Sequence, residues 1–250
     1  MARKNKTPLR NSTVTCVIGD SNKTDMLSHW VSMWLKFHNR GDIFIYDPQH
    51  RILKEQQDKY KKGQGHHLIV HNPEFTWINM IYDIYNTVKD KRKTPKLLVL
   101  NAGDILFPAP LEKIIIREKG IKKEIQQRPI MPMLFLELIM KKRLYNMDII
   151  IAFQDPDSLP ANLEYFTNRF IVLPVTMQYY VDRRNMVMSQ LDLCIKATNK
   201  YDPFRKSFKE YIHFNTEKNI IYASPAMNRT EFEKIIKELT PERKKIDLNY

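Results

Sequence analysis

The residues best suited to chemistry begin at Gly19, where a run of β-branched residues ends and a Lys-Thr pair follows after a short polar turn. Residues 13–18 predict a buried strand, and apolar periodicity from Asp25 onward predicts a helix directly after Lys23 and Thr24. This order is the frame of a phosphate-binding loop, because backbone amides and the positive end of the helix face the phosphates there. The lysine adds a point charge and the hydroxyl holds Mg²⁺.

The loop departs from the usual spacing of such sites. The usual pattern is Gly, four residues, Gly, Lys and Ser or Thr, whereas three residues separate Gly19 from Lys23 and Asn22 stands in place of the second glycine. Asparagine tolerates left-handed backbone angles better than most residues, so the turn can survive, but a plain strand–turn–helix also fits. The candidate nucleotide contacts are Gly19, Asp20, Ser21, Asn22, Lys23, Thr24 and Asp25, with Thr24 as the Mg²⁺ ligand.

Composition limits the class of protein. The chain has 250 residues, of which 43% are hydrophobic and 28% charged, which suits one sizeable domain with a small C-terminal appendage. The formal net charge of +13 indicates a polyanionic partner such as nucleic acid, although a lysine-rich genome bias explains it too. Cys16 and Cys194 form neither a disulfide framework nor a metal site, which fits a reducing setting. We see no signal peptide and no apolar run that predicts a membrane span.

Strands and helices are predicted in alternation, which indicates an α/β fold with a mostly parallel sheet and helices on both faces. The predicted strands are 13–18, 43–46, 67–70, 96–100, 148–153 and 170–173, and the predicted helices are 25–39, 73–88, 132–145, a short one ending at 169, and 176–197. Basic segments at 49–66 and 113–123 are expected to be exposed loops. A hairpin at 211–222 and a helix at 231–239 complete the chain. We expect a disordered basic arm (1–11), a main domain (12–200) and a hairpin–helix extension (201–250).

Polar residues follow several of these strands. Asp47, Asn101 and Gln154 stand at strand ends, and Asp104 comes shortly after one. Carboxyl ends of parallel strands line one crevice, so these residues and Lys23 are expected to converge there. The alternatives are ordinary structural roles: Asp47-Pro48 as a turn, and Gln154 as a partner for backbone groups.

This ordered series resembles the FtsK/HerA group of P-loop motor ATPases, which includes viral genome-packaging ATPases and Zot-like phage-assembly proteins. The resemblance covers about residues 13–175. It consists of the phosphate loop, Asp47-Pro48, a Walker B strand at 97–100 followed by Asn101-Ala102 and a Phe-Pro segment at 107–108, a helix closing in Arg143, and a strand ending in Gln154. The resemblance implies a RecA-like, ASCE-type P-loop NTPase domain that binds ATP and Mg²⁺.

The resemblance also implies roles for individual residues. Gln154 would sense the γ-phosphate, and Arg143 would act as an inter-subunit arginine finger, although in its Lys-Lys-Arg run it also fits a solvated face. Asn101 replaces the aspartate that orients the metal, and Ala102 replaces the glutamate that polarises the attacking water. Loss of a positioned base typically costs about a hundred- to ten-thousandfold in rate. Asp47 and Asp104 are the candidate replacement carboxylates.

Two functions therefore remain open. The first is a DNA translocase or genome-packaging ATPase that works as a ring, with a hexamer as one option, on double-stranded DNA in the host cytoplasm or the virion. Virion or portal proteins would be further partners, and the basic segments 51–62 and 113–123 would grip DNA. The second is a catalytically inactive relative that serves as a scaffold or a regulatory DNA-binding subunit. Whether the chain is an enzyme is left open by Asn101 and Ala102.

Overall fold

The fold was described from a computed structural model of the whole chain. The description covers residues 12–19, 22–38, 41–48, 66–71, 77–90, 94–107, 113–118, 121–126, 131–154, 156–174, 190–201 and 209–240. The predicted loop at 49–66 lies almost entirely outside these residues, as do the basic arm and most of the predicted helix 176–197.

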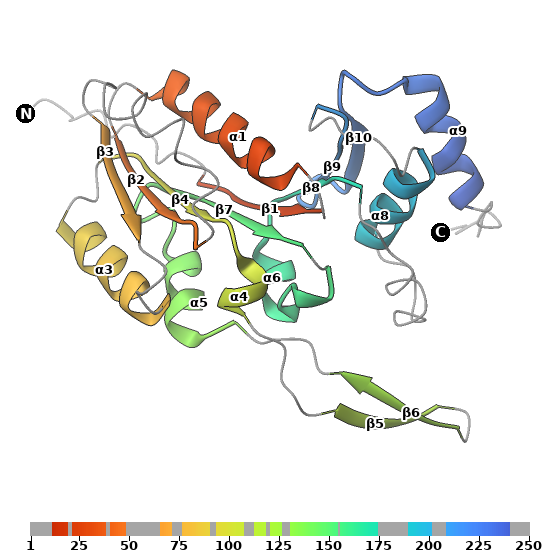
Figure 1. Cartoon of the computed structure of the whole chain (residues 1–250), viewed down its shortest axis with the longest axis horizontal. Helices are drawn as coiled ribbons and strands as arrows, with labels where there is room; N and C mark the ends of the chain where they lie inside the picture. Colours follow the sequence, from red (N-terminus) through yellow and green to blue (C-terminus); the bar gives the residue numbers. More distant parts are fainter. Residues whose placement is uncertain are drawn as a thin grey trace, which may run out of the picture.

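An eight-stranded sheet forms the centre of the molecule, in the order β10-β9-β8-β1-β7-β4-β2-β3 (Figure 1). The six strands from β8 to β3 run parallel, and β9 and β10 continue the sheet antiparallel beyond β8. The strands are β1 (Val14–Ile18), β2 (Gly41–Tyr46), β3 (His66–His71), β4 (Lys96–Leu100), β7 (Met147–Phe153), β8 (Arg169–Val172), β9 (Ile212–Asn215) and β10 (Ile220–Ala223). The α/β class and the mostly parallel sheet predicted from the sequence are confirmed.

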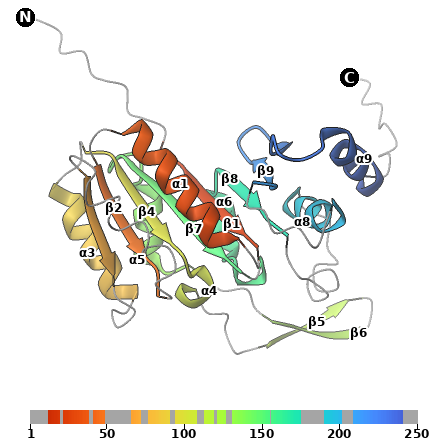
Figure 2. The same cartoon turned by 45° about the horizontal axis from the view of Figure 1, so that its top comes forward.

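Helices cover both faces of this sheet (Figures 1 and 2). One face carries α1 (Lys23–Phe37). The other carries α3 (Trp77–Asp90), α4 (Gly103–Leu106), α5 (Met133–Met140) and α6 (Ala161–Phe166), with α8 (Gln190–Tyr201) and α9 (Arg229–Leu239) beyond β8; a short 3-10 turn, η1 (Pro156–Ser158), precedes α6. Strand residues alternate between two buried clusters: in β4, Leu97 and Val99 belong to the α1 side, and Leu98 and Leu100 to the other. Burial on both faces explains why the central strands are continuously apolar.

Two expectations from the sequence are wrong. The basic segment 113–123 is not a loop, because β5 (Lys113–Glu118) and β6 (Ile121–Gln126) pair as an antiparallel hairpin. Three consecutive β-branched residues, 114–116, favour the strand over the loop that the lysines suggest. The helix predicted over 132–145 ends at Met140, and residues 141–146 form a turn in which Asn146 has a positive φ of 53°.

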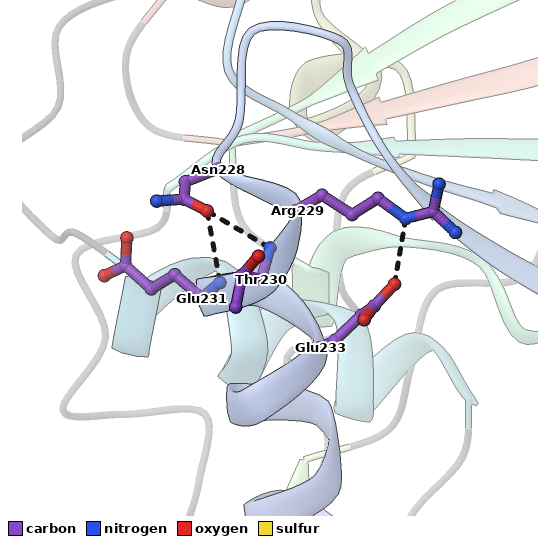
Figure 3. Close-up of polar contacts among 5 residues, drawn as sticks. All are labelled: Asn228, Arg229, Thr230, Glu231 and Glu233. Carbon is purple, nitrogen blue, oxygen red and sulfur yellow. Dashed lines mark hydrogen bonds and ion pairs between the residues drawn. The ribbon is translucent and has the colours of Figure 1, made fainter.

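The C-terminal part begins with the β9–β10 hairpin and ends with α9, both close to their predicted positions. Figure 3 shows why α9 begins where it does: the Asn228 side-chain oxygen accepts hydrogen bonds from the amides of Thr230 and Glu231, at 3.1 and 3.3 Å. Such a cap satisfies donors that the first turn otherwise leaves unpaired. Arg229 pairs with Glu233 one turn later, at 2.9 Å. The division into a domain and an extension near residue 200 stays a prediction, since β9 joins the main sheet.

Candidate nucleotide site

The turn after β1 is held tightly between two neighbouring strands. The Gly19 amide donates a hydrogen bond to the Phe153 carbonyl of β7 at 3.1 Å, and the Leu173 amide after β8 donates to the Ile18 carbonyl at 2.8 Å. A Cβ atom at Gly19 would lie 2.6 Å from the Leu173 Cβ. A residue without a side chain is therefore required where the chain leaves the sheet toward α1.

Asn22 completes the turn and starts the helix. Its φ of 62° and ψ of 7° place it in the left-handed region, which explains why asparagine can stand where glycine is usual. The Asn22 carbonyl accepts the Met26 amide at 3.0 Å, so Lys23 and Thr24 are the first residues of α1, both half-buried, and Asp25 is exposed. The first-turn amides and the positive dipole end of α1 lie at this point. Asp20 and Ser21 lie outside the described residues.

Asp47 and Asn101 meet at the ends of two adjacent strands. The Asn101 side-chain Nδ2 donates to the Asp47 Oδ1 at 2.9 Å, and the Asn101 amide donates to the Tyr46 carbonyl at 2.9 Å. Asp47 is completely buried. The contact depends on the order of the sheet, which places β2 beside β4, and the sequence alone did not predict it.

Asp104 and Gln154 form the second polar contact of this edge. The Gln154 amide donates to the Asp104 Oδ2 at 2.7 Å, and Gln154 itself is exposed. Asp104 lies in the short α4, which follows β4 directly after the buried Ala102. The candidate replacement carboxylate thus contacts the end of β7, next to the carbonyl that holds Gly19.

These residues share one edge of the sheet. Positions 47, 101 and 154 continue the strand alternation of the residues that pack on α1, namely Ile45, Val99 and Ala152. The structure therefore brings Asp47, Asn101, Asp104 and Gln154 to the edge where α1 begins, as the sequence predicted for a parallel sheet.

Arg143 is not brought to this edge. It lies exposed in the turn that precedes β7, whereas Gln154 follows the same strand, so the two residues stand at opposite ends of β7. The turn itself is well anchored, because the Lys96 amide donates to the Asn146 carbonyl at 2.9 Å and the buried Lys96 ammonium donates to the Tyr145 carbonyl at 3.2 Å. Arg143 can serve a nucleotide only on a neighbouring subunit, and that role stays a prediction.

The side-chain oxygen atoms at the edge where α1 begins are of the kind that coordinates a magnesium ion. Mg²⁺ prefers carboxylate and hydroxyl oxygens together with phosphate oxygens, and Thr24, Asp47 and Asn101 supply such atoms. These residues together carry less negative charge than a site with aspartate at position 101, because Asn101 is neutral. Within the residues that the structure describes, no three His, Cys, Asp or Glu side chains cluster as a metal site by themselves, so the nucleotide would have to supply part of the coordination.

A separate cavity of about 530 Å³ lies under α1 near the opposite end of the strands. Its walls include Trp30, Trp34 and Arg169, and the buried Asp148 accepts a hydrogen bond from the Trp34 indole Nε1 at 3.1 Å. Trp34 is buried and Trp30 is half-buried. None of the candidate phosphate-binding residues lines this cavity, so it is not the nucleotide site.

No protein-family model and no curated protein matches the sequence. Solved structures do match the fold. B204, the DNA-packaging ATPase from Sulfolobus Turreted Icosahedral Virus, aligns with a TM-score of 0.58 at 13% identity over 88% of this chain and 100% of its own. The genome packaging NTPase B204 from Sulfolobus turreted icosahedral virus 2, in complex with ATP-gammaS, gives 0.56 at 11% identity, over 87% and 98%. ATPases 2 and 3 of Thermomonospora curvata EccC give 0.51 at 10% identity, over 87% of this chain and 37% of that one.

This chain has the P-loop NTPase fold. The resemblance to the FtsK/HerA group drawn from the sequence is confirmed at the level of fold. Identities of 10–13% establish the architecture, while the roles of single residues remain to be argued from their geometry.

Proposed function

We propose that this protein is a nucleotide-dependent motor subunit of the P-loop type, which binds ATP at the α1 edge and couples its hydrolysis to movement of double-stranded DNA. The observation that carries the proposal is the convergence at one sheet edge of the Gly19–Phe153, Asn101–Asp47 and Gln154–Asp104 hydrogen bonds. Similarity to a structure described as a genome packaging NTPase supports the choice of DNA.

Phosphate binding falls to the start of α1. In this proposal the amides of its first turn contact the phosphates, Lys23 adds a positive charge, and the Thr24 hydroxyl coordinates the metal ion beside the phosphates. Bound Mg²⁺ would neutralise phosphate charge and orient the terminal phosphate. Asp47, which accepts a hydrogen bond from Asn101, is fully buried at this edge, and we assign it to the coordination of the metal ion.

Asp104 takes the role of the missing base in this proposal. Its Oδ2 accepts the Gln154 amide, which holds the carboxylate beside the end of β7. Gln154 follows β7 and is exposed, so its side chain is available to a terminal phosphate. Arg143 would complete the site of a neighbouring copy, which requires a ring or a comparable assembly.

DNA binding is supported by charge. A net charge of +13 on 250 residues favours a polyanion through counterion release. The β5–β6 hairpin carries Lys113, Arg117, Lys122 and Lys123, and the basic segment 51–62 lies outside the described residues. We place the protein in the host cytoplasm or the virion, where portal or other virion proteins would be its partners.

A second candidate function has its own observation. Asn101 brings no charge and Ala102 is buried and cannot act as a base, so a relative that binds nucleotide without hydrolysis, as a scaffold or regulatory DNA-binding subunit, also fits the geometry. The two functions differ in one measurable quantity, which is DNA-stimulated ATP turnover.

The deciding experiment compares ATP turnover, with and without double-stranded DNA, in the wild type, Asp104→Asn and Asp83→Asn. Asparagine at 104 still accepts the Gln154 amide but has no basicity, so turnover should fall about a hundred- to ten-thousandfold. Asp83 is an exposed acid on α3 and serves as the matched control. Absence of turnover in the wild type, with nucleotide binding retained, would establish the inactive function instead.

A further inference from the structure

The cavity under α1 has the size and the walls of a small-molecule site. Its volume is about 530 Å³, and ligand pockets in proteins span roughly 300–1,000 Å³ with mostly apolar and aromatic walls. Aromatic side chains make up much of its lining, namely Trp30, Trp34, Phe37, Tyr211, His29 and His38. The described phosphate-binding candidates are not among its lining residues, so a ligand here would be additional to the nucleotide.

The cavity lies between the C-terminal half of α1 and the beginnings of the strands that this helix crosses. Figures 1 and 2 show α1 lying across β1 and β7, and both strands contact the helix. The sheet side of the cavity includes Thr15 of β1, Ile150 of β7 and Arg169 of β8. Phe37 and His29, on the helix side, are exposed, so the cavity is open to solvent along α1.

The indole of Trp34 forms a fixed aromatic wall. Its Nε1 donates to the Asp148 Oδ2 at 3.1 Å, and its ring lies 4.3 Å, centroid to centroid, from the His38 ring. A Cβ atom at Gly41 would lie 2.4 Å from the outer edge of the indole, so this glycine gives the ring its room. A flat ring held on several sides is a ready surface for stacking another ring.

The buried Asp148 carboxylate already has its hydrogen bonds. Its Oδ1 accepts the Thr13 amide at 2.9 Å and the Thr13 hydroxyl at 3.2 Å, and its Oδ2 accepts the Trp34 indole. A buried carboxylate that is bonded on both oxygens needs no further donor. Asp148 therefore gives no reason to expect a cationic ligand.

Two hydrogen-bond donors on the sheet side stand in a different position. Thr15 and Arg169 are register partners on adjacent parallel strands, and both precede by two residues a position that packs on the α1 side, Val17 and Ile171. Thr15 is only 2% exposed. Within the part of the chain that the structure describes, nothing accepts a hydrogen bond from the Arg169 guanidinium, and the Thr15 hydroxyl has no partner. Buried polar groups are normally hydrogen-bonded, so a ligand that suits this cavity brings acceptor oxygens.

The charge of the surroundings limits the ligand to one negative charge. Arg169 offers one positive charge, in the forked geometry that matches a carboxylate. Asp148 on the neighbouring strand is acidic, and the last carbonyls of α1 add partial negative charge at the same end of the helix. A ligand with two negative charges would leave one of them without a counter-charge.

We propose that this cavity is a binding site for a small aromatic monocarboxylate, whose carboxylate pairs with Arg169 and Thr15 and whose ring lies against the indoles of α1. The proposal is independent of nucleotide binding, since the start of α1 lies at the opposite edge of the sheet. It is tested on the full chain without nucleotide.

Isothermal titration calorimetry with three probes of similar shape tests the ligand class. The probes are cinnamate, its neutral amide cinnamamide, and fully ionised styrylphosphonate, which carries two charges. The wild type should bind cinnamate at one site and each of the other probes at least about tenfold more weakly, as expected when a charged hydrogen bond is lost or a second charge is uncompensated. Absence of saturable cinnamate binding by the folded wild type would overturn the proposal. So would binding of the amide or the phosphonate as tight as that of cinnamate.

Variants locate the site. Arg169→Gln should weaken cinnamate binding at least about tenfold, and Thr15→Val about two- to tenfold. Arg229→Gln removes the same charge from an exposed position on α9 and should bind as the wild type does. Lys23→Ala should also keep wild-type affinity for cinnamate, which separates this test from that of the nucleotide site. Wild-type affinity in Arg169→Gln, or an equal loss in Arg229→Gln or Lys23→Ala, would contradict the assignment.

Filling the cavity gives a second test that does not depend on the folding of Arg169→Gln. Met33 is a half-buried residue of α1 that lines the cavity. In Met33→Trp the larger side chain should occupy the space, so cinnamate binding should be lost while the circular dichroism spectrum stays that of the wild type. Unchanged cinnamate affinity in this folded variant would place the ligand elsewhere and overturn the proposal.

Discussion

Asp47 and Asn101 form a hydrogen-bonded pair at the edge of the sheet where α1 begins. One is a fully buried carboxylate and the other is the amide that donates to it. A buried charge is tolerated when it is hydrogen-bonded, so Asn101 stabilises Asp47 in the way that a second carboxylate at this position could not. This gives a structural reason for asparagine at a strand end where the resemblance implies aspartate.

Asn101→Asp should therefore destabilise the protein. The substitution removes the Nδ2 donor and sets two carboxylates about 2.9 Å apart, where both cannot ionise easily. We expect the free energy of unfolding to fall by about 1–3 kcal/mol at pH 7.5. The loss should shrink toward pH 4.5, because protonation of the introduced carboxyl removes the repulsion between the two side chains.

Urea denaturation at the two pH values measures this effect. Asn219→Asp is the matched control, since Asn219 is exposed in the β9–β10 turn. If Asn101→Asp is as stable as the wild type at pH 7.5, the two side chains do not touch. Added Mg²⁺ should recover part of the lost stability if this edge binds the metal.

At the scale of elements, α4 lies close to β7 because position 103 has no side chain. A Cβ at Gly103 would lie 2.4 Å from the Phe153 ring, and Phe153 is fully buried. This close approach brings Asp104, the next residue, to the Gln154 amide. The glycine thus positions the candidate base.

Gly103→Ala should lower the free energy of unfolding by about 1–3 kcal/mol, the usual cost of overpacking a core. It should also lower turnover in any active preparation, because α4 must move away from β7. Ile105→Ala, at a position of the same helix that is 53% exposed, should change stability far less. Thermal unfolding of both variants gives the comparison, and equal stabilities would contradict the close packing of α4.

Strand β9 carries a histidine whose protonation opposes folding. Burial and the nearby Arg169 lower the pKa of His213 below its usual value of 6.5. The unfolded chain therefore binds a proton that the folded chain does not, so stability is present above about pH 6.5 and is lost as the pH falls below it.

Comparing the wild type with His213→Gln tests this. Denaturation midpoints at pH 7.5 and pH 5.5 should differ less in the variant than in the wild type, since other groups titrate equally in both. His29→Gln, at an exposed position on α1, should keep the wild-type difference. If the pH dependence of stability is unchanged in His213→Gln, His213 has the same pKa in the folded and the unfolded chain.

The sequence predicts the elements better than it predicts their contacts. The strand at 96–100 could be located because residues 97–100 are all apolar. A short, continuously apolar run is typical of a strand that is buried on both faces of a sheet. The 113–126 hairpin was missed because lysines obscured its isoleucine pattern. The Asp47–Asn101 contact was out of reach, since periodicity does not say that β2 lies beside β4.

For the whole molecule, the account predicts DNA binding that weakens steeply with salt. Each phosphate contact contributes about 0.9 to the slope of log affinity against log salt. Arg117 and Lys122 are register partners in the β5–β6 hairpin, so the double variant Arg117→Ala/Lys122→Ala should reduce that slope by about 2. Fluorescence anisotropy over a salt series gives the slope.

Lys234→Ala/Lys237→Ala is the charge-matched control, with both lysines exposed on α9. It should leave the slope closer to the wild-type value than the hairpin variant does. Equal slopes in the two variants would assign DNA binding to net charge alone, and a wild-type affinity indifferent to salt would remove the electrostatic basis of the proposal.

Among the residues described, no helix has the length and apolar character needed to cross a membrane. What the whole molecule offers instead is a sheet with one polar edge, a basic hairpin and an acidic, partly apolar helical face. A motor subunit needs a nucleotide site and a DNA-binding surface, and the proposed function assigns these to the polar edge and the basic hairpin.

The central claim, that the α1 edge binds nucleotide phosphates, is tested most directly by calorimetric titration of a non-hydrolysable ATP analogue with Mg²⁺. The wild type should bind, and Lys23→Ala should bind at least about tenfold more weakly, which corresponds to loss of one charged hydrogen bond. Lys36→Ala, an exposed lysine at the other end of α1, should bind as the wild type does. Equal affinities for wild type and Lys23→Ala, or no binding by the folded wild type, would contradict the account.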